Sequence, residues 1–200
     1  TTNNDKINIT DVIKEGQRLL VQVKKDSNLQ KGARVSTHIN LPSKYIALMP
    51  NTDIITVSQK IEDKEEQERL IKLVKENLSP ENGAIIRTSA AGKNQEIIED
   101  IKNLEKRWKE IQSKFENDKD SKPKLILKAN GIFEKMIIDL PEKSVQKIII
   151  NSKEEYDNIL KFNKMNNYLS GTDIVLKKNE DVFDIYDVKK EISKLENRKI

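Results

Sequence analysis

The sequence contains no cysteine and only one histidine, His38. Without cysteine the chain cannot form disulfides, thiolate nucleophiles or cysteine-ligated metal sites, and this composition fits a reducing compartment such as the cytoplasm. The six glycines are scattered, and none belongs to a glycine-rich loop that cradles nucleotide phosphates. No apolar run approaches the roughly 18 residues of a membrane span, and the N-terminal stretch lacks a secretory signal pattern. We therefore expect a cytoplasmic protein without a membrane span.

Charged residues make up 35% of the 200 positions and leave a net charge of +4. Most basic residues are lysine, and only six are arginine, which is typical of a bias toward A/T-rich codons. The excess of basic residues is concentrated near the N-terminus, so that this third of the chain is the candidate anion-facing part. The chain begins with Thr1 instead of methionine and ends inside a helical pattern, and we expect it to be a piece of a longer protein.

The first part of the chain is predicted to be rich in β-strands and to contain two helices. Strands are expected at residues 19–23, 33–39, 45–49, 53–61 and 84–88, and helices at 62–78 and 95–116. The apolar residues of the second helix recur with spacings of 4, 3, 4, 3 and 4. They are Ile97, Ile101, Leu104, Trp108, Ile111 and Phe115. This stripe is expected to pack on a sheet.

The second part is predicted to alternate between strands and helices. Residues 117–123 are polar and end in Pro123, which is typical of a linker. Beyond them we expect strands at 125–128, 147–151 and 173–177 and helices at 132–140, 154–162 and 182–195. This alternation is typical of βαβ units. The predicted fold class is therefore α/β (mixed α+β), with a small β-rich unit containing two helices followed by a βαβ subdomain.

Arg87 and Thr88 form the most specific candidate site in the sequence. They stand at the end of a predicted strand, before the small residues Ala90, Ala91 and Gly92. A guanidinium, a hydroxyl and open backbone amides could together hold a phosphate. The alternative is an ordinary arginine at a strand end that pairs with a nearby acid. Arginine is rare in this chain, and its presence here favours a role that needs its planar geometry.

Other polar clusters are better explained as surface. His38 lies on the polar face of a predicted strand, and we interpret it as solvent-facing or structural instead of an RNA or ligand contact. The acids of residues 62–66 are expected to complement a helix N-terminus and not to bind a metal. Asp181, Asp184 and Asp187 are interpreted as a solvated helix face. We assign no catalytic and no metal-binding residue to this chain.

Several strings of the sequence resemble signatures of the ribonuclease E/G family. Residues 31–42 (KGARVSTHINLP), 45–51 (YIALMPN), 57–62 (VSQKIE) and 83–90 (GAIIRTSA) stand in the same order and spacing as the family's KGARLTTHISLPGRYLVLMPN, ISRRIE and GLIVRTA. The resemblance is strong over residues 9–112 and continues weakly to the end. It implies three parts: the end of an OB-fold RNA-binding domain at 1–32, a 5′ sensor at 33–118 and an RNase H-like subdomain at 119–200.

The resemblance also implies a function. The parent would be a cytoplasmic, magnesium-dependent endoribonuclease that forms a homo-oligomer, cleaves single-stranded RNA in RNA processing and decay, and senses a 5′-monophosphate. Arg87 and Thr88 match the phosphate-binding Arg-Thr of the sensor, Ser43 and Ala47 match positions that line the same pocket, and Lys31 matches an RNA-contacting residue. The strand that carries the catalytic Asp is expected beyond Ile200. We therefore expect the chain to bind RNA without cutting it and to need no cofactor itself.

The chain departs from the family pattern at two places near the predicted pocket. Ser43 stands where the family usually has glycine, which would narrow the pocket if close backbone approach is required there. Gln59 and Lys60 replace an Arg-Arg pair and remove one positive charge. The competing hypothesis is a stand-alone RNA-binding or scaffolding module with no nuclease attached.

Overall fold

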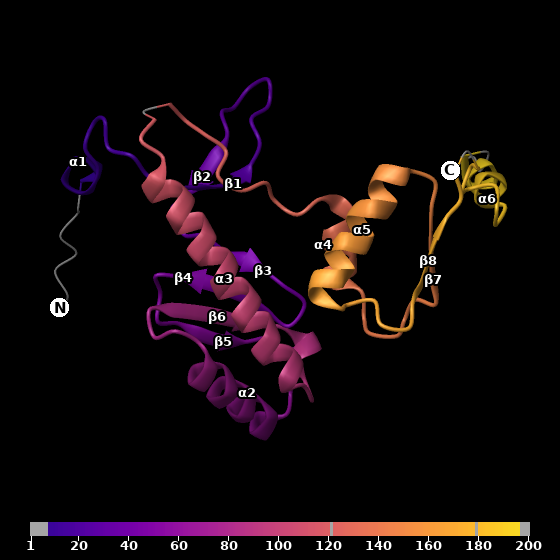
Figure 1. Ribbon diagram of the computed structural model, residues 1–200, viewed down its shortest axis with the longest axis horizontal. Coiled ribbons are helices and arrows are strands. Elements are labelled where there is room, and N and C mark those ends of the chain that lie inside the picture. Colours follow the sequence, from indigo (N-terminus) through magenta and orange to yellow (C-terminus); the bar gives the residue numbers. More distant parts are fainter. Residues whose placement is uncertain (1–7, 121, 179, 197–200) are drawn as a thin grey trace. The chain divides into compact units, whose positions relative to one another are not determined.

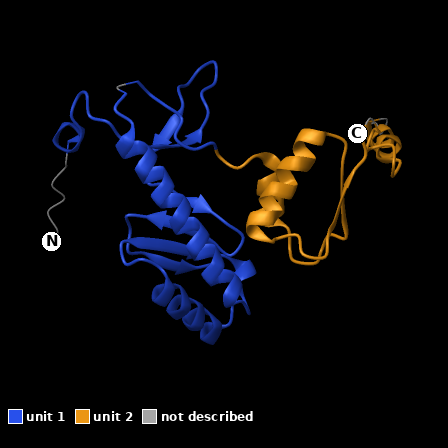
Figure 2. Cartoon of the chain, viewed as in Figure 1, with its two compact units in different colours: residues 1–128 blue, residues 129–200 orange. Residues whose placement is uncertain are grey.

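The computed structural model describes residues 8–120, 122–178 and 180–196, which form two compact units, residues 1–128 and 129–200 (Figure 2). Both units mix helices and strands, so the predicted fold class is confirmed. The finer division at residues 32 and 118, taken from the resemblance, stays a prediction. The first seven residues of the predicted OB-fold remnant and Ser121 of the predicted linker lie outside the described residues.

The first unit is built on a four-stranded sheet with the order β3-β4-β6-β5 (Figure 1). Its strands are β3 (Leu41–Pro42), β4 (Ile46–Pro50), β5 (Ile55–Val57) and β6 (Asn82–Ile86). β4 runs antiparallel to β3 and β6, and Ala47 pairs with both Pro42 and Ile85. β5 and β6 are parallel and are connected through helix α2 (Lys64–Asn77). The carboxyl ends of these two strands therefore lie at the same edge of the sheet.

Two helices cover this sheet. The Asp63 side chain caps α2 by accepting the backbone N–H groups of Glu65 and Glu66, and Leu70 and Val74 are fully buried. Helix α3 (Gln95–Asn117) packs on β4 and against α2, and it crosses the sheet in Figure 1. Its buried apolar residues are Ile97, Ile101, Leu104, Trp108 and Ile111. The predicted stripe is thus confirmed, with its last member, Phe115, only half-buried.

The N-terminal part is less buried than its sequence suggested. It contains α1 (Ile9–Val12) and a two-stranded antiparallel ribbon of β1 (Gln22–Lys25) and β2 (Arg34–Ser36). The predicted buried strand at 19–23 is wrong, because β1 begins three residues later and Leu19 and Val21 are both exposed. The predicted strand at 33–39 ends at Ser36, and Val35 is exposed as well. A two-stranded ribbon buries little apolar area, which explains the exposure.

The second unit is a small βαβ arrangement, as predicted. Its elements are α4 (Ile132–Asp139), β7 (Lys147–Ile150), α5 (Lys153–Asn166), β8 (Asp173–Leu176) and α6 (Val188–Glu196). β7 and β8 are parallel and joined through α5. The core of the unit is formed by Ile137, Ile150, Ile159 and Leu169.

Two predicted elements of the C-terminal half are wrong. Residues 125–128 form no strand, and Leu125 is 75% exposed, because no neighbouring strand pairs with this segment in the described structure. The last helix begins at Val188 instead of residue 182. Residues 182–187 form turns, and Asp187 adopts the left-handed conformation with φ of 55°, which interrupts a helix. Across the described ranges we find no helix with both the length and the apolar character needed to cross a membrane.

Candidate functional site

Polar side chains meet at the edge of the sheet where the parallel strands β5 and β6 end. Ser58 follows β5 directly, and Arg87 and Thr88 follow β6, with Thr88 opening a single 3₁₀ turn (Thr88–Ala90). The Ser58 N–H donates to the Ile86 carbonyl at 2.8 Å, and the Ser58 and Thr88 hydroxyl oxygens lie 3.1 Å apart. In α/β folds the carboxyl ends of parallel strands are the usual place for ligands.

The Arg87 side chain is held at this edge by the segment that leads into β4. Its backbone N–H donates to the Tyr45 carbonyl at 2.8 Å, and its Nη1 donates to the Ser43 carbonyl at 2.7 Å. Arg87 is half-buried, whereas Thr88 is exposed. Backbone and side chain of Arg87 are therefore both fixed by one short segment, which gives its donors a defined direction.

A buried carboxylate supports that segment from the helix side. Asp100 of α3 is 3% exposed and accepts hydrogen bonds from the Ser43 hydroxyl and from the Tyr45 N–H, the latter at 3.1 Å. A buried carboxylate that receives such bonds fixes the groups that donate to it. The same two residues, Ser43 and Tyr45, thus connect Asp100 to Arg87.

Our sequence analysis did not identify Asp100, although the sequence holds a signal for it. Asp100 lies three residues after Ile97 and four before Leu104, which places it on the apolar stripe of α3. A carboxylate on an apolar stripe must find hydrogen-bond donors when the stripe is buried.

The loop between β6 and α3, residues 87–94, is fixed at its C-terminal end by two residues of α2, Glu66 and Arg69. Arg69 binds Glu66 in a two-pronged ion pair, with Nε to Oε2 at 2.6 Å and Nη2 to Oε1 at 2.7 Å. The Gly92 N–H donates to Glu66 at 2.8 Å, and Arg69 donates to the Lys93 carbonyl at 3.2 Å and to the Asn94 side chain. The loop that starts with Arg87 and Thr88 is therefore anchored at both ends.

These contacts also set the protonation of Glu66. The hydrogen bonds from Arg69 and from the Gly92 N–H lower the pKa of the Glu66 carboxyl from 4.5 to about 2. Because the folded-state pKa is depressed, the stabilisation that Glu66 provides is fully present above pH 4.5. It is lost as the pH falls from there through about 2.

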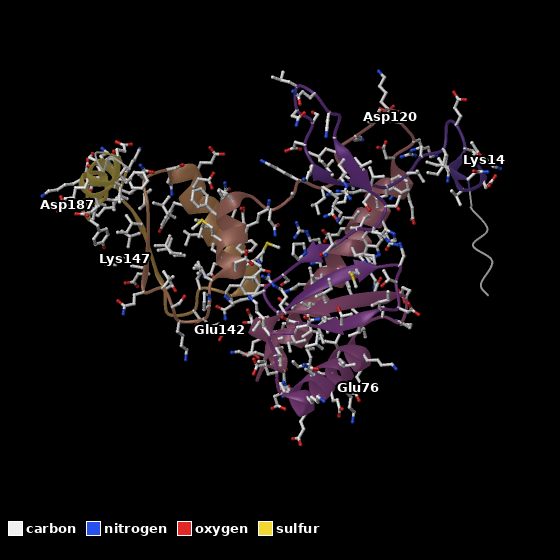
Figure 3. All side chains as sticks on the ribbon, turned by 180° about the vertical axis from the view of Figure 1, so that it is seen from behind. Lys14, Glu76, Asp120, Glu142, Lys147 and Asp187 are labelled. Carbon is white, nitrogen blue, oxygen red and sulfur yellow. The ribbon has the colours of Figure 1, made fainter. Side chains whose placement is uncertain are left out.

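We expect Glu66→Gln to lower the free energy of unfolding at pH 7 by about 1–2 kcal/mol, because charge-assisted bonds are lost while the site stays partly solvated. The variant should also lose less stability than the wild type between pH 5 and 2, as urea melts at successive pH values would show. The control is Glu76→Gln on the same helix. Glu76, which is labelled on α2 in Figure 3, has a side chain that is 60% exposed, and its Oε1 lies 4.0 Å from Lys72 Nζ. Equal pH dependence of wild type and Glu66→Gln would contradict this account.

The structure brings some of the predicted site residues together and leaves others apart. Arg87 and Ser43 are in direct contact, and Thr88 follows Arg87. The Ser43 side chain is buried and bonded to Asp100, so its hydroxyl is directed to α3. Ala47 is 7% exposed and lies inside the sheet. Lys31 lies in the exposed turn of the separate β1–β2 ribbon, where its N–H donates to the Asn28 side chain.

The remaining polar clusters lie on the surface. His38 is exposed. Asp181 and Asp184 precede α6 and form ion pairs with Lys189 of that helix, so the predicted helix face is a surface turn instead. In the part of the chain that the structure describes, no group of three or more His, Cys, Asp or Glu residues could hold a metal ion.

Comparison with known proteins agrees with the sequence signatures around this site. Ribonuclease G of Salmonella typhimurium (strain SL1344) is 32% identical over 205 residues, covering 96% of this chain and 39% of the relative. Ribonuclease G of Escherichia coli (strain K12) is 31% identical with the same coverage. A Ribonuclease E/G-like protein of Porphyra purpurea is 36% identical over 146 residues, covering 72% of this chain and 28% of the relative.

The chain spans about two fifths of the length of the Ribonuclease G relatives. The model of the Ribonuclease E/G family matches residues 40–200, a range that includes the sheet, Arg87 with its supporting contacts and the whole second unit. The chain therefore belongs to the Ribonuclease E/G family.

Proposed function

We propose that this chain is the RNA-binding and 5′-end-sensing portion of an endoribonuclease, and that Arg87 and Thr88 hold the 5′-monophosphate of single-stranded RNA. The observation that carries the proposal is the Arg87 guanidinium held by the Ser43 carbonyl, followed directly by Thr88, whose hydroxyl is supported by that of Ser58, at the carboxyl ends of two parallel strands. A terminal phosphate offers several oxygens, all of them acceptors, to these donors.

The surrounding residues have distinct roles in the proposal. The Ser43 carbonyl orients Arg87, and Ala47 lies buried in β4, next to the segment that holds Arg87. Lys31, on the exposed ribbon, contacts the RNA backbone away from the 5′ end. Phosphate contacts of this kind add affinity for any RNA and do not distinguish its ends.

The activity of the whole protein is part of the same proposal. The curated relatives named Ribonuclease G support an endoribonuclease that acts in RNA processing. Magnesium dependence, a homo-oligomeric state and a cytoplasmic location stay predictions. The described residues contain no cluster of three or more His, Cys, Asp or Glu that could hold a metal ion, and we derive no step of the reaction from this chain. We propose that these 200 residues bind RNA and do not cleave it.

A binding titration tests the proposal. Two RNAs of identical sequence, one with a 5′-monophosphate and one with a 5′-hydroxyl, are compared at fixed salt, because salt changes the affinity for both. We expect the monophosphate to bind more tightly. A 5′-triphosphate should bind less well than the monophosphate although it carries more charge, since shape limits the site. Equal binding of all three RNAs would refute end sensing and support a general RNA-binding module.

A further inference from the structure

We propose that Ser58 is a positioning residue of the 5′-phosphate site, whose hydroxyl directs the proton of the Thr88 hydroxyl toward the bound phosphate. The inference rests on the proposed function and adds to it a residue outside the Arg-Thr pair. Ser58 and Thr88 are 30 residues apart in sequence, yet their hydroxyl oxygens are 3.1 Å apart. At this distance one hydroxyl donates to the other.

Within the pair either hydroxyl could be the donor, and a phosphate bound by Thr88 would decide which of them donates. The Lys60 N–H points to the Ser58 oxygen at 3.4 Å, so that this oxygen already serves as an acceptor. Each hydroxyl carries a single proton. When Thr88 gives its proton to the phosphate, the bond between the two hydroxyls needs the Ser58 proton, so we infer that Ser58 donates to Thr88 in the bound state. The donors then run in one direction, from the Lys60 amide through Ser58 and Thr88 to the ligand.

The position of the Ser58 hydroxyl is set by the sheet. The Ser58 N–H bonds to the Ile86 carbonyl at 2.8 Å, and the Ser58 carbonyl accepts the Ile61 N–H at 3.0 Å. The Ser58 backbone is therefore held in place before a ligand arrives. A chain of hydrogen bonds that ends in a donor suits a phosphate, because a phosphate dianion has only acceptors. Successive bonds in such a chain also strengthen one another.

Ser58 acts through Thr88 instead of touching the ligand itself. Thr88 is exposed, whereas Ser58 is half-buried beneath it at the end of β5. This difference has a measurable consequence. Loss of the Ser58 hydroxyl should weaken phosphate binding only while the Thr88 hydroxyl is present, because a relay needs both members.

A double-mutant cycle tests the inference on the 200-residue chain. The variants are Ser58→Ala, Thr88→Val, their combination and the control Thr56→Ala, which removes an exposed hydroxyl from the same strand. The readout is the ratio of the dissociation constants for 5′-hydroxyl and 5′-monophosphate RNA. We expect Ser58→Ala to lower this ratio about two- to tenfold, the effect of one neutral hydrogen bond, and to change nothing further in the Thr88→Val background. Thr56→Ala should leave the ratio unchanged.

The outcomes separate this inference from the function on which it rests. If the wild type does not prefer the monophosphate, the proposed function fails and the inference falls with it. If the wild type prefers the monophosphate and Ser58→Ala keeps the full preference, the inference alone is wrong. An equal loss in both backgrounds would show that Ser58 binds the phosphate independently, and equal weakening of both RNAs would show general destabilisation. Either result overturns the relay.

Discussion

Replacing Arg87 with alanine is expected to remove most of the discrimination between 5′-monophosphate and 5′-hydroxyl RNA. The loss should be about 1.5–3 kcal/mol, the range for hydrogen bonds to a charged group, which corresponds to roughly ten- to 150-fold in the ratio of dissociation constants. The sheet should persist, because the bond from the Arg87 backbone N–H to the Tyr45 carbonyl does not involve the side chain. Arg87→Lys should recover only part of the discrimination, since lysine keeps the charge without the planar fork.

Lys31→Ala is the matched control for this experiment. Lys31 is exposed on the β1–β2 ribbon, and its loss should weaken binding of both RNAs by the same factor. Titrating each variant against both RNAs gives, for each RNA, the factor by which its dissociation constant rises. If Arg87→Ala also weakens both RNAs equally, Arg87 is a general backbone contact and the sensor assignment does not hold for this chain.

Replacing Trp108 with alanine is expected to lower the free energy of unfolding by about 3–5 kcal/mol, the usual range for emptying a large buried aromatic site. Trp108 is 6% exposed on the inner face of α3, one turn from the buried residues Leu104 and Ile111. The cost combines the loss of buried apolar area with the cavity left behind. Urea or guanidinium melts of the purified chain measure it.

The neighbouring Lys109→Ala serves as the control, because Lys109 is exposed on the same helix and surface changes usually stay within about 0.5 kcal/mol. A loss below 1 kcal/mol for Trp108→Ala would show that the site collapses around the smaller side chain or that the stripe is not essential to the core.

The long helices and the inner strands could be predicted from the sequence because their patterns are local. The stripe of α3 repeats over about five turns, and the structure buries five of its six predicted members. The observed first and last residues of β4 and β6 differ from the predicted ones by one residue in β4 and by two in β6. Leu125 and Leu127 show the limit of such patterns. With Ile126 they form a short apolar run like that of a buried strand, but such a run is a strand only where another strand pairs with it.

The candidate site could be predicted only in part, for a related reason. Arg87 and Thr88 are adjacent, so one short string identifies both. Their partners come from elsewhere in the chain: Ser58 is 30 residues from Thr88, and Asp100 is 57 residues from Ser43. The same holds for Glu66, which we interpreted as one of several acids at a helix start. Its bond to the Gly92 N–H exists only once α2 has packed beside the loop.

The place of β6 in the sheet has a consequence for how the protein is made. β6 is the last of the four strands to leave the ribosome, yet it lies between β4 and β5. Until it is synthesised, the inner edges of both neighbours lack their partner and are open to pairing with other chains. Arg87 and Thr88 follow β6 immediately. Assembly of the candidate site can therefore begin only when β6 closes the sheet, and it is completed when α3 follows and brings Asp100 to Ser43 and Tyr45.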